Sequence, residues 1–256
     1  MMINQFYIKD KNFSEEVKED ILYGFFTRKG GVSKGSFSSL NCSFNNGDRE
    51  MDVKRNREIV CNTFKINPSR LLTVNQIHSN KIVDINRNNF SKKIYADGMI
   101  TSEKNLLLGI LTADCAPILF SGERYIAILH VGWKGLLKGI VNRLIEIFLE
   151  KGENIKRISC IIGPHLAPES FEVKIDFIHQ IQKVRPFFSN FIEKDEGVSR
   201  FNFLNCLKES LRIVGIKKIF ASHLDTFSNP ELFFSYRFNK VRGLECGRQI
   251  SIIGKR

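Results

Sequence analysis

The sequence predicts an α/β protein in which a mixed β-sheet is flanked by helices. Apolar, β-rich runs lie close together between residues 106 and 131, where turn residues separate them. Two amphipathic helical patterns follow, and each of them precedes a further β-rich run. Strands in runs with helices between them are typical of a layered fold with a mixed sheet.

The expected elements follow in order along the chain. A Gly-, Ser- and Asn-rich loop at 29–48 precedes the first helix, which Asp48 could cap and which would run to about residue 64. Two further helices are expected at 137–148, with Gly152 at the C-terminal cap, and at 203–214. Strands are expected at 23–28, 70–77, 81–85, 106–112, 117–120, 125–131, 157–162 and 218–221.

The composition indicates one globular domain spanning residues 1–256. Apolar residues make up 43% and charged residues 26% of the 256-residue chain, and no Pro- or Gly/Ser-rich stretch suggests a linker. The start lacks the apolar core of a signal peptide, and the strongly apolar stretch at 106–111 is too short to span a bilayer. Six scattered cysteines without a CxxC pair suit a reducing compartment. We therefore expect a cytoplasmic protein that has no membrane partner.

The formal net charge of +12 raises the question of nucleic-acid binding. The basic residues are dispersed, without a run of five or a basic helix carrying interleaved aromatics. Because an electrostatic footprint needs clustered charge, we expect no nucleic-acid partner, and nucleic-acid binding stays an alternative. An anionic small substrate is compatible with the charge.

Three residues at the ends of predicted strands offer metal-ligand chemistry. His78 follows an apolar strand, Cys115 lies at another strand end, and His130 ends a third strand before a helix. Two His and one Cys suit zinc and leave a fourth position open, which is the catalytic arrangement. The alternative is a core cysteine with two hydrogen-bonded histidines, and spacing alone favours it because the order matches no known zinc motif.

Several motifs in one order resemble the YfiH-like laccase-domain family, also called the multicopper polyphenol oxidase or peptidoglycan-editing factor family. They extend over nearly the whole chain, at 24–33, 40–41, 75–78, 96–98, 112–117, 130–135, 162–164 and 234–237. The resemblance implies that His78, Cys115 and His130 are the three metal ligands, in an open tetrahedral zinc site where copper is an alternative metal. Two departures are Lys134, where the family usually has Arg, and His165, where it usually has a Cys-containing turn; we expect His165 in a surface loop.

The resemblance also implies a function. Family members are described as phosphorolysing adenosine, inosine and methylthioadenosine, and as deaminating adenosine. We therefore expect a zinc-dependent purine nucleoside phosphorylase with adenosine deaminase activity, whose partners are purine nucleosides and phosphate. The His-x-Glu and Pro-Cys-x-x-Cys motifs of known zinc deaminases are absent. Copper oxidase chemistry is disfavoured, since five histidines without a His-x-His pair cannot furnish a trinuclear cluster as well.

Other residues receive expected roles around this centre. Asp97 and Asp114 are candidate acid/base or ligand-orienting groups, although Asp114 could point away from Cys115, and Lys134 is a third catalytic candidate. Arg28 beside Gly30-Gly31, and Gly132 before a helix, are candidate phosphate-binding residues. The family resemblance adds Asn41 as a substrate-binding residue. Trp133, the single Trp, is expected to pack under the metal rather than stack on a base.

One alternative enzyme class remains for the same residues. Cys115 could be a nucleophile with His130 as its base, which is the arrangement of a cysteine hydrolase. An amidase acting on peptidoglycan precursors, which the editing-factor name implies, belongs to this class. Metal content distinguishes the two classes, because a zinc-ligated thiolate is not free to attack.

Overall fold

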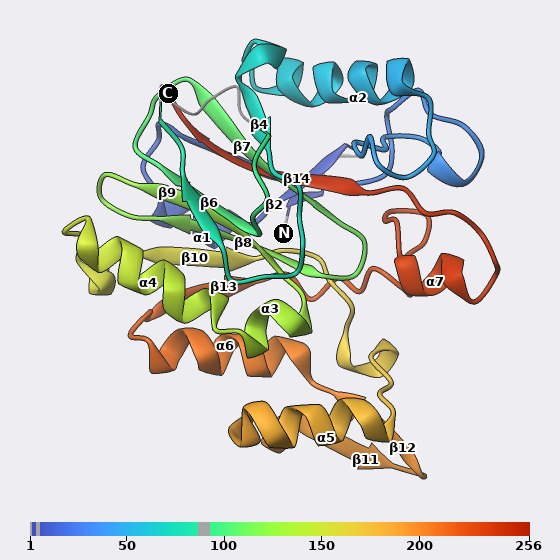
Figure 1. The fold of residues 1–256 in the computed structure, drawn as a ribbon. Helices are drawn as coiled ribbons and strands as arrows, with labels where there is room; N and C mark the ends of the chain where they lie inside the picture. Colours follow the sequence, from blue (N-terminus) through green and yellow to red (C-terminus); the bar gives the residue numbers. More distant parts are fainter. Residues whose placement is uncertain (1, 4–5, 87–92) are drawn as a thin grey trace.

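The computed structural model describes residues 2–3, 6–86 and 93–256 (Figure 1). Its helices are α1 (Lys11–Glu16), α2 (Glu50–Thr63), α3 (Trp133–Leu137), α4 (Ile140–Glu150), α5 (Ile175–Val184), α6 (Phe203–Ile213) and α7 (Tyr236–Lys240). Its strands are β1 (Met2–Ile3), β2 (Tyr7–Lys9), β3 (Ile21–Phe26), β4 (Leu71–Thr73), β5 (Ile82–Asp84), β6 (Gly98–Thr101), β7 (Leu106–Thr112), β8 (Ala116–Ser121), β9 (Ile126–Val131), β10 (Ser159–Ile162), β11 (Ile192–Asp195), β12 (Val198–Phe201), β13 (Lys218–Ala221) and β14 (Gln249–Lys255). None of the helices described in these ranges has the length and apolar character needed to cross a membrane.

The strands form two mixed six-stranded sheets and a small hairpin. The first sheet has the order β1-β2-β3-β14-β7-β4, and the second has the order β13-β10-β8-β9-β6-β5. Most neighbours are antiparallel, but β4 runs parallel to β7, β5 to β6, and β13 to β10. β11 and β12 pair only with each other. The predicted α/β class with mixed strand directions is confirmed, and the strands divide between two sheets.

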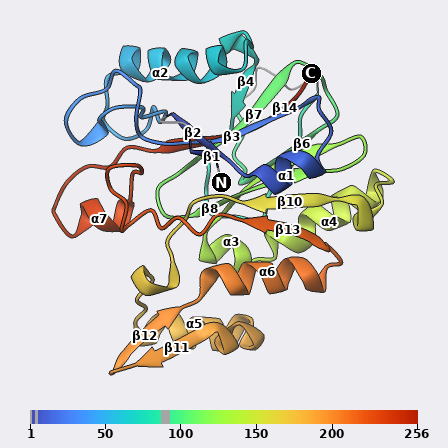
Figure 2. The ribbon, with the colours of Figure 1, turned by 180° about the vertical axis from the view of Figure 1, so that it is seen from behind.

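The two sheets stack between helical layers. α2 covers the outer face of the first sheet, and α4 and α6 cover the outer face of the second (Figures 1 and 2). α5 and the β11–β12 hairpin lie beyond α6 (Figure 1). One apolar cluster lies between the sheets, and one lies between each sheet and its helices.

This layering explains why the central strands are apolar throughout. In β9, Ile126 and Ile128 pack between the two sheets, whereas Ala127 and Leu129 belong to the cluster that contains α4 and α6. Successive side chains of a strand point to opposite faces, so a strand covered on both faces needs apolar residues at every position. These runs therefore mark strands buried on both sides.

Several elements differ from the sequence-based expectation. α2 has Arg49 at its N-cap, because the Oδ2 of Asp48 accepts hydrogen bonds from Ser33 and Asn41 instead of capping the helix. The predicted helix at 137–148 is broken at Gly139, whose φ of +77° is left-handed backbone that separates α3 from α4. The predicted strand at 70–77 contributes only β4 to the sheet. Further elements lie outside the predicted ones; they are β1, β2, β6, β11, β12, β14, α1, α5 and α7.

Candidate metal centre

Three chain segments bring the predicted ligands to one edge of the second sheet. Cys115 precedes β8, and His130 is the last but one residue of β9. The register pairs Ala116 with Val131 in these antiparallel strands, so the start of β8 lies beside the end of β9. β6 pairs Gly98 with Leu129, which places Asp97 at the same edge.

The carboxylate of Asp97 fixes the turn that carries His78. It accepts hydrogen bonds from the backbone N–H of Ile77 (3.1 Å), His78 (2.9 Å) and Ser79 (2.6 Å), and from the Ser79 hydroxyl (2.7 Å). The side chain of Gln76, two residues before His78, forms two hydrogen bonds with the backbone of Leu111 and so holds the start of this turn. His78 adopts a φ of +54°, a conformation that L-residues rarely adopt outside turns and functional sites.

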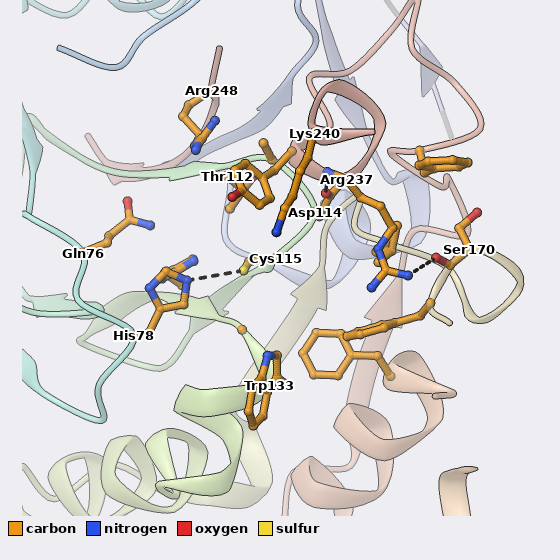
Figure 3. A pocket seen from close by; sticks show the side chains of 18 of the residues that line it. Gln76, His78, Thr112, Asp114, Cys115, Trp133, Ser170, Arg237, Lys240 and Arg248 are labelled. Atoms are coloured by element: carbon orange, nitrogen blue, oxygen red, sulfur yellow. Dashed lines mark hydrogen bonds between the residues drawn. The ribbon is translucent and has the colours of Figure 1, made fainter. Parts of the chain in front are cut away.

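The same carboxylate orients the second histidine. The Nδ1 of His130 lies 2.9 Å from the Oδ1 of Asp97, which leaves its Nε2 free for a metal. The Nε2 of His78 lies 4.0 Å from the Sγ of Cys115, and the two imidazole rings are nearly perpendicular at 82° (Figure 3). All three donor atoms lie within 4.8 Å of one another. A carboxylate–histidine pair beside two further borderline or soft donors fits a metal with an open fourth position.

Gly132 leaves room for an ion at this group. A Cβ at Gly132 would lie 2.9 Å from the Sγ of Cys115 and 3.2 Å from the Cδ2 of His78. Its φ of −89° is open to any residue, so space rather than backbone conformation demands glycine. The binding role predicted for Gly132 is thus accompanied by a steric role toward the metal ligands.

The site stabilises the charged forms of Cys115, His130 and Asp97. Burial opposes ionisation of Cys115, but His130 and then His78 lower the pKa of its thiol to about 6. Burial also opposes charging of His130, yet the Cys115 thiolate and the Asp97 carboxylate raise its pKa to about 9. Burial of Asp97 is likewise outweighed by hydrogen bonds from His130 and Ser79, which lower its pKa to about 2. The lowered pKa favours the thiolate of Cys115, which is the form of cysteine that binds metal.

The metal group lies in a pocket of about 1310 Å³ (Figure 3). This exceeds the range of about 300–1,000 Å³ typical of small-molecule sites, and it leaves space for two reactants. Aromatic side chains line the part next to α5 and α6; they are Trp133, Phe171, Phe177, Phe203 and Phe227. Cationic side chains also line it; they are Lys174, Arg200, Arg237, Lys240 and Arg248.

The predicted catalytic residues have different surroundings. Asp97 contacts the turn of His78 and the ring of His130, so it acts as a positioning residue for two ligands. Asp114 lines the pocket, but its carboxylate accepts hydrogen bonds from the Thr226 hydroxyl (2.8 Å) and the Arg237 N–H (2.7 Å). Burial raises the pKa of Asp114, although these bonds oppose the shift. It anchors the segment that leads into α7.

Lys134 and Arg28 are not among the residues that line the pocket. Lys134 is exposed, and its Nζ lies 5.5 Å from the ring centroid of Trp133. The guanidinium of Arg28 donates to the carbonyl oxygens of Ser38 (2.7 Å) and Pro230 (2.8 Å). Their roles in catalysis and phosphate binding stay predictions.

Asn41 is fully buried beneath the pocket rim. Its Oδ1 accepts from the N–H of Ser43 and of Arg248, and its Nδ2 donates to Asp48. Ser43 and Arg248 themselves line the pocket, so Asn41 holds two lining segments together. Substrate contact by Asn41 is not indicated by these bonds, and its predicted binding role would be indirect.

Sequence reasoning missed Gln76, Lys240 and Arg248 as pocket residues. Gln76 lies two residues before His78 and was within reach of motif analysis, whereas Lys240 and Arg248 carry no local signal. His165 was expected on a surface loop, and that expectation was wrong. Its side chain is buried, with Nδ1 2.8 Å from the carbonyl oxygen of Gly163, because the turn after β10 folds back over the core.

The sequence is similar to bacterial proteins along most of its length. It is 31% identical over 233 residues to a Haemophilus influenzae protein named purine nucleoside phosphorylase, covering 89% of this chain and 91% of the relative. It is 28% identical over 264 residues to the Bacillus subtilis purine nucleoside phosphorylase YlmD, covering 96% and 93%.

Solved structures and a family match agree with this similarity. The fold superposes on the Bacillus licheniformis hypothetical protein YfiH with a TM-score of 0.89 at 26% identity, covering 99% of this chain and 97% of the other. YlmD from Geobacillus stearothermophilus has the same fold, with a TM-score of 0.88 at 24% identity over 100% and 98%. Residues 22–256 match the family described as multi-copper polyphenol oxidoreductase laccase. The chain therefore belongs to this laccase-like family, together with the YfiH and YlmD proteins.

Proposed function

We propose that this protein is a zinc-dependent purine nucleoside phosphorylase that acts on adenosine, inosine and methylthioadenosine and also deaminates adenosine. The observation that carries the proposal is the three-donor group of His78, Cys115 and His130 on the wall of a large pocket lined by aromatic and cationic side chains. The names of the relatives support phosphorylase activity. We infer zinc as the metal, the three individual nucleosides and the deamination in addition to the phosphorylase activity.

The donor set favours zinc over a multicopper centre. Among the described residues, His78, Cys115 and His130 form the single group of three or more candidate metal ligands. A multicopper oxidase needs a trinuclear, imidazole-rich cluster besides a mononuclear site, and one three-donor group cannot supply it. A copper ion could still occupy the same ligands. When bound, a zinc ion would supply Lewis acidity to a reacting oxygen or nitrogen.

The aromatic part of the pocket suits a purine. Trp133 is half-buried and contacts Phe177 at a centroid distance of 5.0 Å, and Phe177 contacts Phe171 at 6.1 Å. Aromatic rings bind the faces of heterocyclic bases by stacking and apolar contact. We therefore expect the base at this end, with the ribose between it and the metal ligands. This role for Trp133 replaces the expectation that it merely packs under the metal.

Product analysis tests the proposal directly. Adenosine and inosine are incubated with metal-loaded protein, with and without inorganic phosphate, and the products are identified by mass spectrometry. Phosphorolysis yields free base and ribose 1-phosphate only with phosphate, whereas deamination converts adenosine to inosine in either condition. Free ribose as the sole sugar product would indicate a hydrolase, and unreacted nucleoside in every condition would refute the proposed class.

A cysteine hydrolase, including a peptidoglycan-precursor amidase, is the second candidate. Asp97, His130 and Cys115 form a carboxylate–imidazole–thiol series in which Asp97 holds the ring at 2.9 Å. That is the arrangement of a nucleophile, its base and an orienting acid. His78 distinguishes the candidates, because a dyad needs one histidine and an open zinc site needs both.

Alkylation separates the two candidates. A nucleophilic Cys115 should react rapidly with iodoacetamide, whereas a metal-bound thiolate should react slowly until a chelator removes the metal. We expect slow alkylation of the metal-loaded protein, fast alkylation after chelation, and inactivity of His78→Ala. Rapid alkylation of the metal-loaded protein together with an active His78→Ala would favour the hydrolase.

A further inference from the structure

We propose that Lys240 and Arg248 form the subsite for inorganic phosphate, on the side of the pocket that faces the metal ligands. This inference rests on the proposed phosphorolysis and names the residues that would bind its second reactant. It assigns the anion to the segment around α7 and β14, in place of the phosphate-binding candidates Arg28 and Gly132.

The two cations come from different segments, and both line the pocket beside the ring of Tyr236. Lys240 ends α7, and Arg248 directly precedes β14. The Nζ of Lys240 lies 5.7 Å from the ring centroid of Tyr236, and the guanidinium carbon of Arg248 lies 5.8 Å from the same centroid. In Figure 3 both charged groups are turned into the pocket, on the side of His78 and Cys115. An anion bound in the pocket within reach of both groups would be attracted by two positive charges.

Neither charge is neutralised by the protein. The Nη1 of Arg248 donates to the carbonyl oxygens of Cys246 (2.9 Å) and Gly247 (2.8 Å), which orient the guanidinium without supplying negative charge. Lys240 is exposed at the rim. Within residues 2–3, 6–86 and 93–256, neither side chain forms a salt bridge. Guanidinium and ammonium groups are the side-chain cations that bind phosphate oxygens in proteins.

Arg237 and Arg200 lie near carboxylates, those of Asp114 and Asp195, and Lys174 lies at the start of α5 on the aromatic side of the pocket. Arg237 donates to the carbonyl of Ser170 (2.8 Å) and lies over the ring of Phe171 at 5.3 Å. Arg200 lies 3.9 Å from a carboxylate oxygen of Asp195. The segment that carries Phe171 also brings carboxylates to the pocket lining, which would repel a dianion; they are Glu169, Glu172 and Asp176. The aromatic end therefore suits the base, and the opposite end suits phosphate.

This division matches the reaction. In phosphorolysis an oxygen of the hydrogen phosphate dianion forms a bond to C1′ of the ribose while the C1′–N9 bond breaks. The bonding electron pair leaves with the purine, which takes up the proton that the phosphate carried. Free purine and ribose 1-phosphate result, without an oxidant or a reductant. Lys240 and Arg248 would hold the dianion on the ribose side of the base, where the attacking oxygen must lie.

Calorimetry with inorganic phosphate tests the subsite without turnover. Lys240→Gln and Arg248→Gln remove one charge each, and Lys156→Gln is the matched control because this exposed lysine precedes β10 at the far end of the sheet. We expect each pocket variant to raise the Kd of phosphate by about 10-fold or more, the effect of losing one charge-assisted hydrogen bond. The KM for phosphate should rise in parallel, whereas metal content and the KM for nucleoside should change less than about 2-fold.

Conservative variants protect the test against misfolding. Lys240→Arg and Arg248→Lys retain the charge and should bind phosphate more tightly than the Gln variants. The unfolding temperature of every variant is measured to show that it is folded. Unchanged phosphate affinity in two folded Gln variants would overturn the subsite, as would its loss in Lys134→Gln or Arg28→Gln alone. Binding of adenosine 5′-monophosphate that requires Lys240 and Arg248, without any binding of inorganic phosphate, would also overturn it.

The subsite and the proposed function can fail separately. Active phosphorolysis with no dependence of phosphate affinity on either residue would refute the subsite alone. Phosphate binding that depends on both residues, in a protein that cleaves no nucleoside, would refute the phosphorylase and leave the subsite supported.

Discussion

The metal centre and the loop at 29–48 are both rich in polar and small residues, yet their polar groups are used differently. In the loop, the backbone N–H of Val32 donates to the Oδ1 of Asn56 (2.8 Å), and that of Ser33 donates to the carbonyl of Ser39 (2.9 Å). The N–H of Gly31 donates to the Ser39 hydroxyl. These three amides, which could have contributed to a phosphate cradle, are thus bonded to the loop itself or to α2.

At the metal centre, the hydrogen bonds involve the groups around the metal-donor atoms instead. Asp97 consumes the Nδ1 of His130 and the backbone N–H groups around His78, but the Nε2 atoms and the Sγ of Cys115 face one another. The surrounding bonds therefore orient the donors and leave their lone pairs available. A group whose polar atoms are all bonded internally is structural, whereas a group held by its neighbours with converging free donors is a binding site.

Removal of a ligand should cause the largest loss of metal affinity. In Cys115→Ser or His130→Ala we expect metal affinity to fall by more than about 100-fold, beyond the loss typical of an outer partner. Elemental analysis of dialysed protein measures the metal content. Metal content equal to that of the unmodified protein in both variants would contradict the assignment of the ligands.

Removal of the orienting carboxylate should have the next largest effect. Asp97→Asn should lower metal affinity by about 10–100-fold, since it weakens the hold on His130 and on the His78 turn. Asp225→Asn is the control, because Asp225 is also buried and also accepts backbone N–H groups, from Ala167 and Phe227. Titration with a competing chelator should separate them: both variants should lose stability, and only Asp97→Asn should lose metal affinity.

A methyl group at Gly132 tests whether metal binding needs the space beside Cys115 and His78. Gly132→Ala should lower metal affinity by about 10-fold, because the new Cβ would crowd Cys115 and His78 while the backbone tolerates alanine. Gly24→Ala is matched in crowding, with its Cβ 3.1 Å from the Tyr7 ring and away from the metal ligands. Equal metal affinities in the two variants would remove the steric role of Gly132.

A substitution at Arg28, which contacts the loop at Ser38, should lower the stability of the protein and leave its phosphate affinity unchanged. Arg28→Ala removes two hydrogen bonds to carbonyls and a stacking contact 4.4 Å from the Phe234 centroid. We expect a loss of about 1–3 kcal/mol in the free energy of unfolding, measured by urea denaturation. The Kd of phosphate should be unchanged; a large rise in that Kd in a stable variant would restore Arg28 to the anion site.

The smallest effect concerns a second buried histidine. Burial lowers the pKa of His165 below its usual value, and a hydrogen bond to Gly163 opposes this shift only in part. As pH falls below about 6.5, the unfolded chain takes up a proton that folded His165 resists, so stability falls toward acidic pH. Urea denaturation should show a loss of about 1 kcal/mol between pH 7 and pH 5.5 that His165→Gln lacks. An identical pH dependence in both proteins would contradict this explanation.

The sequence predicted the individual elements best where burial is two-sided. The apolar runs of β7, β8 and β9 are interior strands, so their composition alone marks them. β14 was missed despite its central position, because it lies beyond the last recognised motif and its pairing with β3 and β7 is long-range. Asp48 was misread as a cap because its carboxylate is bound to Ser33 and Asn41, which only the folded loop brings near.

The sequence by itself predicted the α/β class from its buried strands and the family from its ordered motifs, and the family resemblance indicated the three candidate ligands. Only the tertiary structure decided how those ligands are held. Asp97 bonds both His78 and His130 because β6 and β9 are paired, although Asp97 lies 19 and 33 residues from them in the chain. Arg248 likewise lines the pocket because it directly precedes β14, which pairs between β3 and β7. Hydrogen bonds and charges act through space, so residue types suggest which groups can react while the fold decides which of them meet.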